Sequence, residues 1–404
     1  MRKRIVSSGL TGAKSGPDSN WMDFGAWLSS QPATVNLRSC TVVKRLTLVL
    51  LPLCVLAQDA RLTSIRKTVL ETRQYANQHQ EVRGGIPQVT VTKHEILDWI
   101  EARLARFPQD GDAAALTATL NSGLSQAKLF CDKDSDCFPT ALGFLDEIQI
   151  ERQGDFLIAK TAVGVGIRCG YDYSAYIYQW SDGKWQRIWE NEQNDYSASA
   201  YFPQLLHSVQ ISDPGPDGKR LILTLGTQAG CLTFKEVYYR VWRLGMQMPL
   251  LDKRELLYDE GDPPVAGTIQ PGDLRIEFSA GGGGYGYPHK AVRHFEIHGI
   301  TVKQVDPIAP TPRDFVEEWL AAPWQKSAGL AESPTLQQWH QKLHRDDDEG
   351  DFPDNPVNCD SDPERWQIGT HLQDEPSHYF IVRWHRPDRF TMVQISDRPL
   401  QACK

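Results

Sequence analysis

Hydrophobic residues change their spacing near residue 131, and this change separates a helical part of the chain from a strand-rich part. Before it, apolar residues recur three or four positions apart, as Ile96 and Ile100 do, which is typical of amphipathic helices. We expect three helices between residues 58 and 130. Thr92 followed by Glu95 has the pattern of a capping box, which predicts that the second helix begins there.

From about residue 145 to 305, short runs rich in Ile, Val, Tyr and Trp alternate with Gly, Asp and Pro, which is typical of strands and turns. Two of these segments repeat a pattern in which a Cys precedes a Tyr by 7 positions and a Trp by 11. The two sets are Cys169, Tyr176 and Trp180, and Cys231, Tyr238 and Trp242. A third, degenerate copy begins at Leu274.

Together with the strand before it, each copy predicts a four-stranded antiparallel meander, the unit of a propeller-like array. A closed propeller needs more than three such units. Either strands from the C-terminal part complete a ring, or the array stays open.

The C-terminal part combines helices and strands. Thr311 and Pro312 predict the start of one helix, and Ser333 and Pro334 the start of another. Strands are expected at 366–372, 378–384 and 390–396. The predicted fold is therefore α+β and mainly β, divided into 1–57 (an upstream extension with a signal peptide), 58–130 (a helical module), 131–308 (about three β-meander repeats) and 309–404 (an α+β region).

A leader pattern lies inside the first of these segments. Lys44 and Arg45 precede an apolar run of 12 residues, Leu46–Ala57, which ends in a small residue. A helix needs roughly 20 apolar residues to cross a bilayer. We therefore predict a signal peptide cleaved near Ala57, an exported bacterial protein, periplasmic or secreted, and no permanent membrane span.

Two alternatives to this leader remain open. Cys54 would be the lipid-modified residue of a lipoprotein, although Leu53 stands where a small residue is normal. Residues 1–42 resemble no leader, which favours a start near Val43, but a cytoplasmic extension is the other interpretation.

Charge narrows the choice of partners. Residues 1–57 carry seven Lys or Arg and two Asp or Glu, so removing them changes the formal charge from −8 to −13. An acidic chain lacks the basic surface that neutralises phosphates. We expect no binding to nucleic acid or anionic membranes, and instead a protein or glycan partner in the cell envelope.

Cysteine usage agrees with export. An even number of cysteines in an exported chain favours disulfides. The expected pairs are Cys131 with Cys137, Cys169 with Cys231, and Cys359 with Cys403. Six cysteines permit other connectivities.

Two acidic loops are candidate calcium sites. In CDKDSDC, Asp132, Asp134 and Asp136 stand at alternate positions, as at the start of an EF-hand loop, although Cys137 and Gly143 occupy positions where that loop has Gly and Glu. The alternative is a solvated loop closed by a disulfide.

The turn SDPGPDGKRLIL supplies the second acidic loop. Through Asp213, Asp217 and Gly218 it resembles the calcium-binding loops of FG-GAP propeller repeats. Gly215 and Leu221, however, stand where that pattern has further oxygen ligands. The alternative is a plain Pro-Asp-Gly turn.

Aromatic residues are the remaining candidates for ligand binding, because exposed rings on a β scaffold stack on sugars or anchor proteins. Most aromatic residues share faces with apolar neighbours and are predicted to lie in the core. Trp185, beside a turn, and Tyr285 and Tyr287, beside the Gly281–Gly284 run, are the predicted surface aromatics.

No catalytic motif stands out. The sequence has no GxSxG elbow, phosphate-binding loop or HExxH motif. His340 and His344 lie four residues apart on a predicted helix, which suits a metal but equally suits two histidines beside a packed stripe. The sequence favours a non-enzymatic binding or interaction protein of the exported class; the alternatives are a cell-envelope hydrolase acting on glycan or peptide, and a carbohydrate-binding module.

Overall fold

The computed structural model describes residues 60–78, 87–130, 145–164, 171–193, 204–228, 235–257, 265–282, 285–305, 309–343, 352–353, 355–359, 362–371, 378–386 and 389–403. The chain divides into two units, Met1–Cys54 and Val55–Lys404. Every described residue belongs to the second unit.

Three helices come first: α1 (Ala60–Gln78), α2 (Pro87–Leu104) and α3 (Ala113–Gln126). Asp112 caps α3 by accepting a hydrogen bond from the Ala114 amide at 2.9 Å. The predicted capping box is wrong, because α2 begins at Pro87, which suits a first helical turn. Thr92 lies inside α2, where its hydroxyl donates to the carbonyl oxygen of Gln88 at 2.8 Å.

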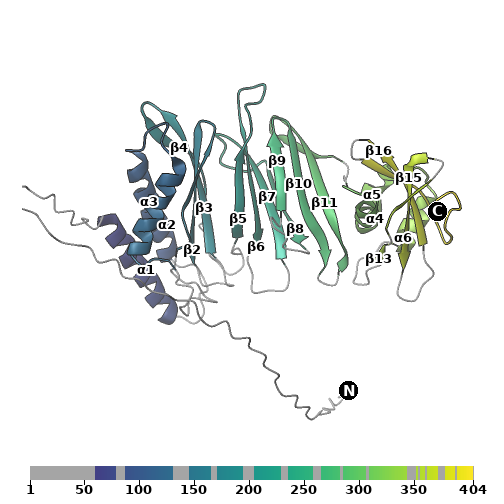
Figure 1. The fold of residues 1–404 in the computed structure, drawn as a ribbon, viewed down its shortest axis with the longest axis horizontal. Helices are drawn as coiled ribbons and strands as arrows, with labels where there is room; N and C mark the ends of the chain where they lie inside the picture. The colour runs from purple at the N-terminus through teal and green to yellow at the C-terminus, as the bar shows by residue number, and fades with distance from the viewer. Residues whose placement is uncertain are drawn as a thin grey trace, which may run out of the picture. The chain divides into compact units, whose positions relative to one another are not determined.

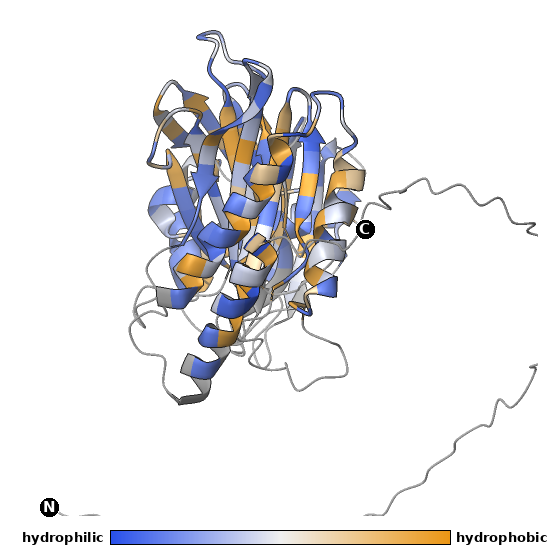
Figure 2. Ribbon diagram, turned by 90° about the vertical axis from the view of Figure 1, so that its left-hand side faces the viewer, coloured by the Kyte–Doolittle hydropathy of each residue, from blue (hydrophilic) through white to orange (hydrophobic). Residues whose placement is uncertain are grey.

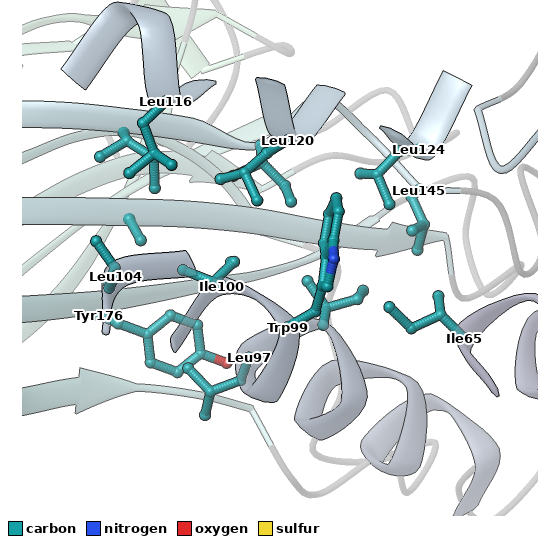
Figure 3. Close-up of a cluster of buried hydrophobic side chains, with 14 of the residues drawn as sticks. Ile65, Leu97, Trp99, Ile100, Leu104, Leu116, Leu120, Leu124, Leu145 and Tyr176 are labelled. Carbon is teal, nitrogen blue, oxygen red and sulfur yellow. The ribbon is translucent and has the colours of Figure 1, made fainter. Parts of the chain in front are cut away.

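These helices bury their apolar stripes against each other and against the first sheet (Figure 3). Trp99 of α2 is 1% exposed at the centre of this core. Leu116, Leu120 and Leu124, one face of α3, complete the helical side. In Figure 2 the same helices show hydrophobic and hydrophilic residues alternating by turn, as amphipathic helices do.

Twelve strands follow as three meanders (Figure 1). The first meander contains β1 (Gln149–Gln153), β2 (Phe156–Gly164), β3 (Tyr171–Ser181) and β4 (Lys184–Asn191). The second contains β5 (Gln204–Ile211), β6 (Leu221–Gln228), β7 (Lys235–Arg243) and β8 (Leu251–Leu257). The third contains β9 (Val265–Gln270), β10 (Asp273–Gly282), β11 (Tyr285–His298) and β12 (Thr301–Gln304). Neighbours within each meander are antiparallel. One parallel pairing, Asp172 with Gln204, joins the first two meanders into an eight-stranded sheet.

The two ends of the meanders differ in their connections. Turns of two residues, at 154–155, 182–183, 271–272 and 299–300, leave one end, which we call the turn end. Longer connections, at 165–170, 192–203, 229–234 and 258–264, leave the other, which we call the loop end, although the connections 212–220 and 244–250 at the turn end are also long. Asp182 and Gly183 both have positive φ, 53° and 74°, as a tight hairpin turn requires.

Each meander packs face to face on its neighbour. Ile158 and Ile177 of the first pack against Val209 and Ile222 of the second, and a separate core lies between the second and third meanders. The sequence repeat is also structural. Trp180 packs on the core shared with the helices, and Trp242 on the core shared with the first meander, so both face the preceding element.

Strand β9 of the third meander is buried on one face only. In β9, Val265 and Ile269 are buried while Ala266, Thr268 and Gln270 are exposed. On β11, by contrast, Val292 pairs with the exposed Glu277 and is itself 0% exposed. The prediction of a mainly β protein built from four-stranded antiparallel meanders is confirmed, and among the described residues no closed propeller is seen.

The C-terminal region contains α4 (Pro312–Ala321), α5 (Trp324–Ser327), a 3₁₀ turn at Ala328–Leu330, α6 (Leu336–Leu343), and the strands β13 (Phe352–Pro353), β14 (Val357–Cys359), β15 (Asp362–His371), β16 (His378–His385) and β17 (Arg389–Ser396). These strands form one antiparallel sheet. Its apolar face packs on α4 and α6 through Phe315, Leu336 and Phe380. Thr311 caps α4 as predicted.

A disulfide between Cys359 and Cys403 holds the C-terminal tail against the other face of this sheet, beside Ile381. Gln367 supports the tail from β15, because it donates to the carbonyl oxygen of Cys403 and accepts from the amide of Leu400. Across the described part of the chain, no helix is both long and apolar enough to span a membrane.

Candidate functional site

Lys93 and Asp172 form a buried ion pair at the loop end, between α2 and β3. Lys93 Nζ lies 2.8 Å from Asp172 Oδ2, with the two side chains 0% and 2% exposed. The same ammonium donates to the carbonyl oxygen of Gln193. Asp172 is also the residue whose backbone pairs with Gln204. The pair therefore stands where the helical module, the first meander and the second meander meet.

Tyrosine–carboxylate pairs surround this junction. The Tyr173 hydroxyl lies 3.1 Å from Asp146 Oδ2, and burial, reinforced by Asp146, raises the pKa of Tyr173 far above its usual range. The Tyr176 hydroxyl donates to Glu192, and burial together with Glu192 likewise raises the pKa of Tyr176. His94 Nε2 approaches the other Glu192 oxygen at 3.4 Å. Both phenols remain protonated donors at physiological pH.

Tyr238 approaches the junction from the second meander. It pairs across the strand with Gly226, where a Cβ atom would overlap the Tyr238 ring and the Leu205 carbonyl oxygen. Only glycine lets the ring lie flat on β6. Burial raises the pKa of Tyr238 above its usual value and outweighs the nearby charges of Arg240 and Arg254, which lower it; the charge of Asp172 adds a smaller rise.

A second polar cluster, the Glu318 network, joins β7, β8, β11 and α4. Arg293 is its centre: Nη1 lies 2.8 Å from Glu318 Oε2, and Nη2 lies 2.7 Å from Glu255 Oε2. His289 Nε2 lies 2.9 Å from Glu318 Oε1. The Tyr239 hydroxyl donates to Glu255 Oε1 at 2.5 Å. Tyr239, Glu255, His289, Arg293 and Glu318 define this network.

Its electrostatics keep Glu318 ionised. Burial alone would raise the pKa of Glu318, but the hydrogen bond from His289 and the charge of Arg293 outweigh burial and lower the pKa from 4.5 to about 2. The pKa of Arg293 is raised, because the two carboxylates outweigh its own burial. Both carboxylates accept hydrogen bonds from Arg293, and Glu318, which stays ionised, has no proton to give to a leaving group.

His378 and Asp397 form an aspartate–histidine pair in the C-terminal sheet. His378 Nδ1 lies 2.8 Å from Asp397 Oδ1, and the histidine side chain is 1% exposed. The ring of Trp339 meets it edge-on at 5.4 Å. Among the described residues neither ring nitrogen of His378 has a hydrogen-bond partner, so Asp397 lies close to Nδ1 without a well-aligned hydrogen bond. A catalytic triad needs that bond and a hydroxyl or thiol at the other ring nitrogen.

The predicted disulfides divide into one observed pair and two untested ones. Cys359–Cys403 is formed, as predicted. Cys131, Cys137, Cys169 and Cys231 lie outside the described residues, as do Asp132, Asp134 and Asp136. Their disulfides and the first calcium loop stay predictions.

The second acidic turn is closed by contacts of its own. Asp217 pairs with Arg243 and accepts a hydrogen bond from the Lys219 amide at 2.9 Å. The Asp213 side chain is 92% exposed and lies 4.0 Å from Arg220. Among the described residues no cluster of three His, Cys, Asp or Glu is arranged to hold a metal. Calcium binding here is untested.

The expected exposure of Trp185 is wrong. This residue is 7% exposed, packs on the helical core, and meets Trp180 edge-on at 5.4 Å. The turn beside it suggested a surface position, but the helices cover this face of the first sheet. The side chains of Tyr285 and Tyr287 lie outside the described set, so their role stays a prediction.

The residues of both polar clusters were not predicted from the sequence. Lys93 could have been noticed, because it occupies a position on α2 four residues after Val89 and seven before Ile100, in the buried stripe. Glu318 gave a similar signal, since it sits beside Trp319 and three residues after Phe315. A charged residue in an apolar stripe predicts a buried partner, although it does not identify that partner. His340 is similar: it is 1% exposed, and its Nε2 lies 3.0 Å from the carbonyl oxygens of Trp319 and Ala322.

Comparison with known proteins gives no family. No protein-family model matches the chain, and no curated protein matches it. Among solved structures, β-1,2-mannobiose phosphorylase from Listeria innocua is similar over 61% of this chain and 60% of its own, with 9% identity and a TM-score of 0.20. The endo-arabinase from Bacteroides thetaiotaomicron is similar over 59% of this chain and 74% of its own, with 9% identity and a TM-score of 0.21. Scores of this size assign no shared activity, so function is argued from this chain's own residues.

Proposed function

We propose that the protein is an exported, non-enzymatic binding protein of the bacterial cell envelope, in which the stacked meanders form a rigid scaffold. The observation that carries this proposal is the state of the buried ionisable groups. We call the pairs Lys93–Asp172, Tyr173–Asp146 and Tyr176–Glu192 the junction cluster. In this cluster and in the Glu318 network, each ionisable group is held by an oppositely charged or hydrogen-bonding partner. Groups held in this way stabilise a fixed architecture and do not exchange protons with a substrate.

The Glu318 network weighs against the glycan-hydrolase alternative. Such enzymes normally use one carboxylic acid with a raised pKa beside one carboxylate. Here Glu255 and Glu318 share Arg293, and the pKa of Glu318 is lowered to about 2. A peptide hydrolase built on His378 and Asp397 would still need a nucleophile.

The exposed apolar residues weigh against the carbohydrate-module alternative. A sugar-stacking surface needs exposed aromatic rings. The large hydrophobic side chains exposed in the described part of the chain are all aliphatic, and they are Leu70, Val91, Met246, Met248, Leu256, Ile300 and Val357. A partner bound mainly through hydrogen bonds and charge fits this surface better than a stacked sugar ring does.

The loop end of the meanders is the proposed binding surface. Long connections positioned by rigid strands are where binding residues concentrate. The junction cluster lies at this end and fixes the strand ends. Lys128 and Glu147 are exposed residues at this end. Two pairings place them there: Phe130 pairs with Leu145, and Leu145 pairs with Val163 at the end of β2.

Export is supported by the disulfide Cys359–Cys403, since disulfides persist in oxidising compartments. The predicted leader, residues 43–57, precedes the described residues. The formal charge of −8 gives no reason to propose a nucleic acid as the partner.

The experiment separates binding from hydrolysis. The mature chain, residues 58–404, is mixed with insoluble bacterial envelope; retained protein is measured by sedimentation, and released sugars and peptides by mass spectrometry. We expect retention without released products. Lys128→Glu at the loop end should lower retention several-fold, whereas the matched substitution Lys184→Glu at the turn end should not. Products released in proportion to the added protein, or no retention, would refute the proposal.

A further inference from the structure

The C-terminal region has an apolar core of its own. Phe315, Trp319, Phe380 and Met392 belong to this core, and its members all lie at residue 309 or beyond. The core between the second and third meanders ends at Ile297, with Val302 packed beside it. Among the described residues, neither core shares a member with the other. The disulfide Cys359–Cys403 also lies wholly within the C-terminal region.

Charged and polar contacts join this region to the third meander. Glu318 of α4 reaches His289 and Arg293 of β11 at 2.9 and 2.8 Å. The side chains of all three are between 8% and 13% exposed. Interfaces of this polar kind resemble those between separable domains more than those within a core.

The N-terminal turn of α4 also lies against the edge of β11, where a neighbouring strand would otherwise pair. β12 pairs with β11 only over residues 295–298, so the earlier part of β11 has an edge that β12 does not cover. On this edge the amide of Lys290 donates to Asp314 Oδ1 at 2.9 Å. The other oxygen of Asp314 accepts from the Thr311 hydroxyl at 2.5 Å. Asp314 thus ties the first turn of α4, capped by Thr311, to a strand edge.

We propose that residues 309–403 form a module that docks reversibly on the edge of β11 through Glu318 and Asp314, and that separates from the third meander while remaining folded when these contacts are lost. Removing one partner of a buried ion pair leaves an uncompensated charge, which is strongly destabilising for the contact concerned. Neither apolar core extends across this interface.

This inference involves the same Glu318 network that the proposed binding function uses, and it adds a conformational change. Undocking exposes the β11 edge at Lys290. An uncovered strand edge is a template for pairing with another extended segment. The docked module therefore masks a strand-pairing edge, and its release makes that edge available.

Hydrogen exchange on the full mature chain tests the inference at single amides. In Glu318→Gln we expect exchange of the Lys290 amide to rise about 100-fold, from the loss of a buried charge pair. Exchange at Ile276, in the core of the third meander, and at Val382, in the C-terminal core, should stay unchanged. This combination is expected only if the module undocks without unfolding.

Two further variants give the control and a milder change. Glu332→Gln breaks a comparable pair with Arg383, 2.8 Å long, inside the C-terminal region, and should leave the Lys290 amide protected. His289→Gln keeps one hydrogen bond to Glu318 and should raise exchange of the Lys290 amide about 10-fold. If Glu318→Gln does not fold, this milder variant provides the test of undocking. Faster exchange at Val382 together with Lys290, or protection of Lys290 in both network variants, would overturn the proposal.

Discussion

In the first meander, β2 is buried along all nine of its residues, whereas β9 of the third alternates between buried and exposed positions. The first meander lies between the helices and the second meander, so both of its faces contribute to cores. The third meander shares its apolar core with the second meander, and ion pairs of Glu318 join it to the C-terminal region. This difference shows that apolar packing joins the helices and the first two meanders. The interface between the third meander and the C-terminal region depends instead on a few ionisable groups.

The largest expected effect tests whether both faces of the first meander contribute equally. Leu157 and Ile158 are neighbours on β2 that face opposite cores, and both are 0% exposed. Leu157→Ala and Ile158→Ala should each lower the free energy of unfolding by about 2–5 kcal/mol, since each leaves a cavity. Urea denaturation followed by tryptophan fluorescence measures this. A cost below about 1 kcal/mol for either residue would mean that its face is not packed.

A slightly smaller loss in the free energy of unfolding, confined to acid pH, is expected at the interface centred on Glu318. Because the pKa of Glu318 falls from 4.5 to about 2 on folding, its contribution is complete above pH 4.5 and is lost as the pH falls towards 2. The groups facing it are His289 and Arg293, with Glu255 and Tyr239 behind Arg293. The ionised Glu318 side chain contributes about 3 kcal/mol to the free energy of unfolding.

The measurement is unfolding free energy against pH for the wild type and Glu318→Gln. The variant should lack this part of the acid dependence. Parallel pH profiles for the two proteins would contradict the assignment of the acid dependence to Glu318.

An intermediate effect is expected where Tyr238 lies on Gly226. Gly226→Ala inserts a methyl group into the ring and should cost about 1–3 kcal/mol by overpacking. Gly329 is the control, because a Cβ atom there would meet nothing within 4 Å. Thermal melting of both variants tests this. Equal melting temperatures would show that the Tyr238 ring moves aside freely.

The smallest effect is expected on the outer face of the third meander. Ile276 and Glu277 are neighbours on β10, one 0% exposed and the other exposed. Ile276→Ala should cost about 2–5 kcal/mol, whereas Glu277→Ala should change stability by less than about 0.5 kcal/mol. A large loss in Glu277→Ala would indicate that something packs on this face.

Much of the local architecture was predictable because it follows from neighbouring residues. The repeated Tyr and Trp positions identified the meanders, and the Thr311 cap marked the start of α4. Helix α2 was misplaced, because Thr92 and Glu95 matched a capping box while Pro87 began the helix earlier. A short motif shows that a start is favourable at one position, but it does not rule out a better start upstream.

The polar clusters were not predictable in the same way. Lys93 and Asp172 are 79 positions apart, and Arg293 and Glu255 are 38 apart. Nothing in the spacing of such residues tells which carboxylate meets which cation. Trp185 was misjudged for a related reason: its turn is local, whereas the helices that cover its ring come from a distant part of the sequence.

The sequence by itself determined the periods of the helices and strands and the number of meanders, because each depends on residue type and local spacing. It offered the pairing of Cys359 with Cys403 as one of several connectivities. Only the tertiary structure decided which faces are covered and which charges meet. Burial is a property of the element packed on top, and an ion pair needs two partners brought together by the fold. For that reason the repeat was visible in the sequence, while the interface centred on Glu318 was not.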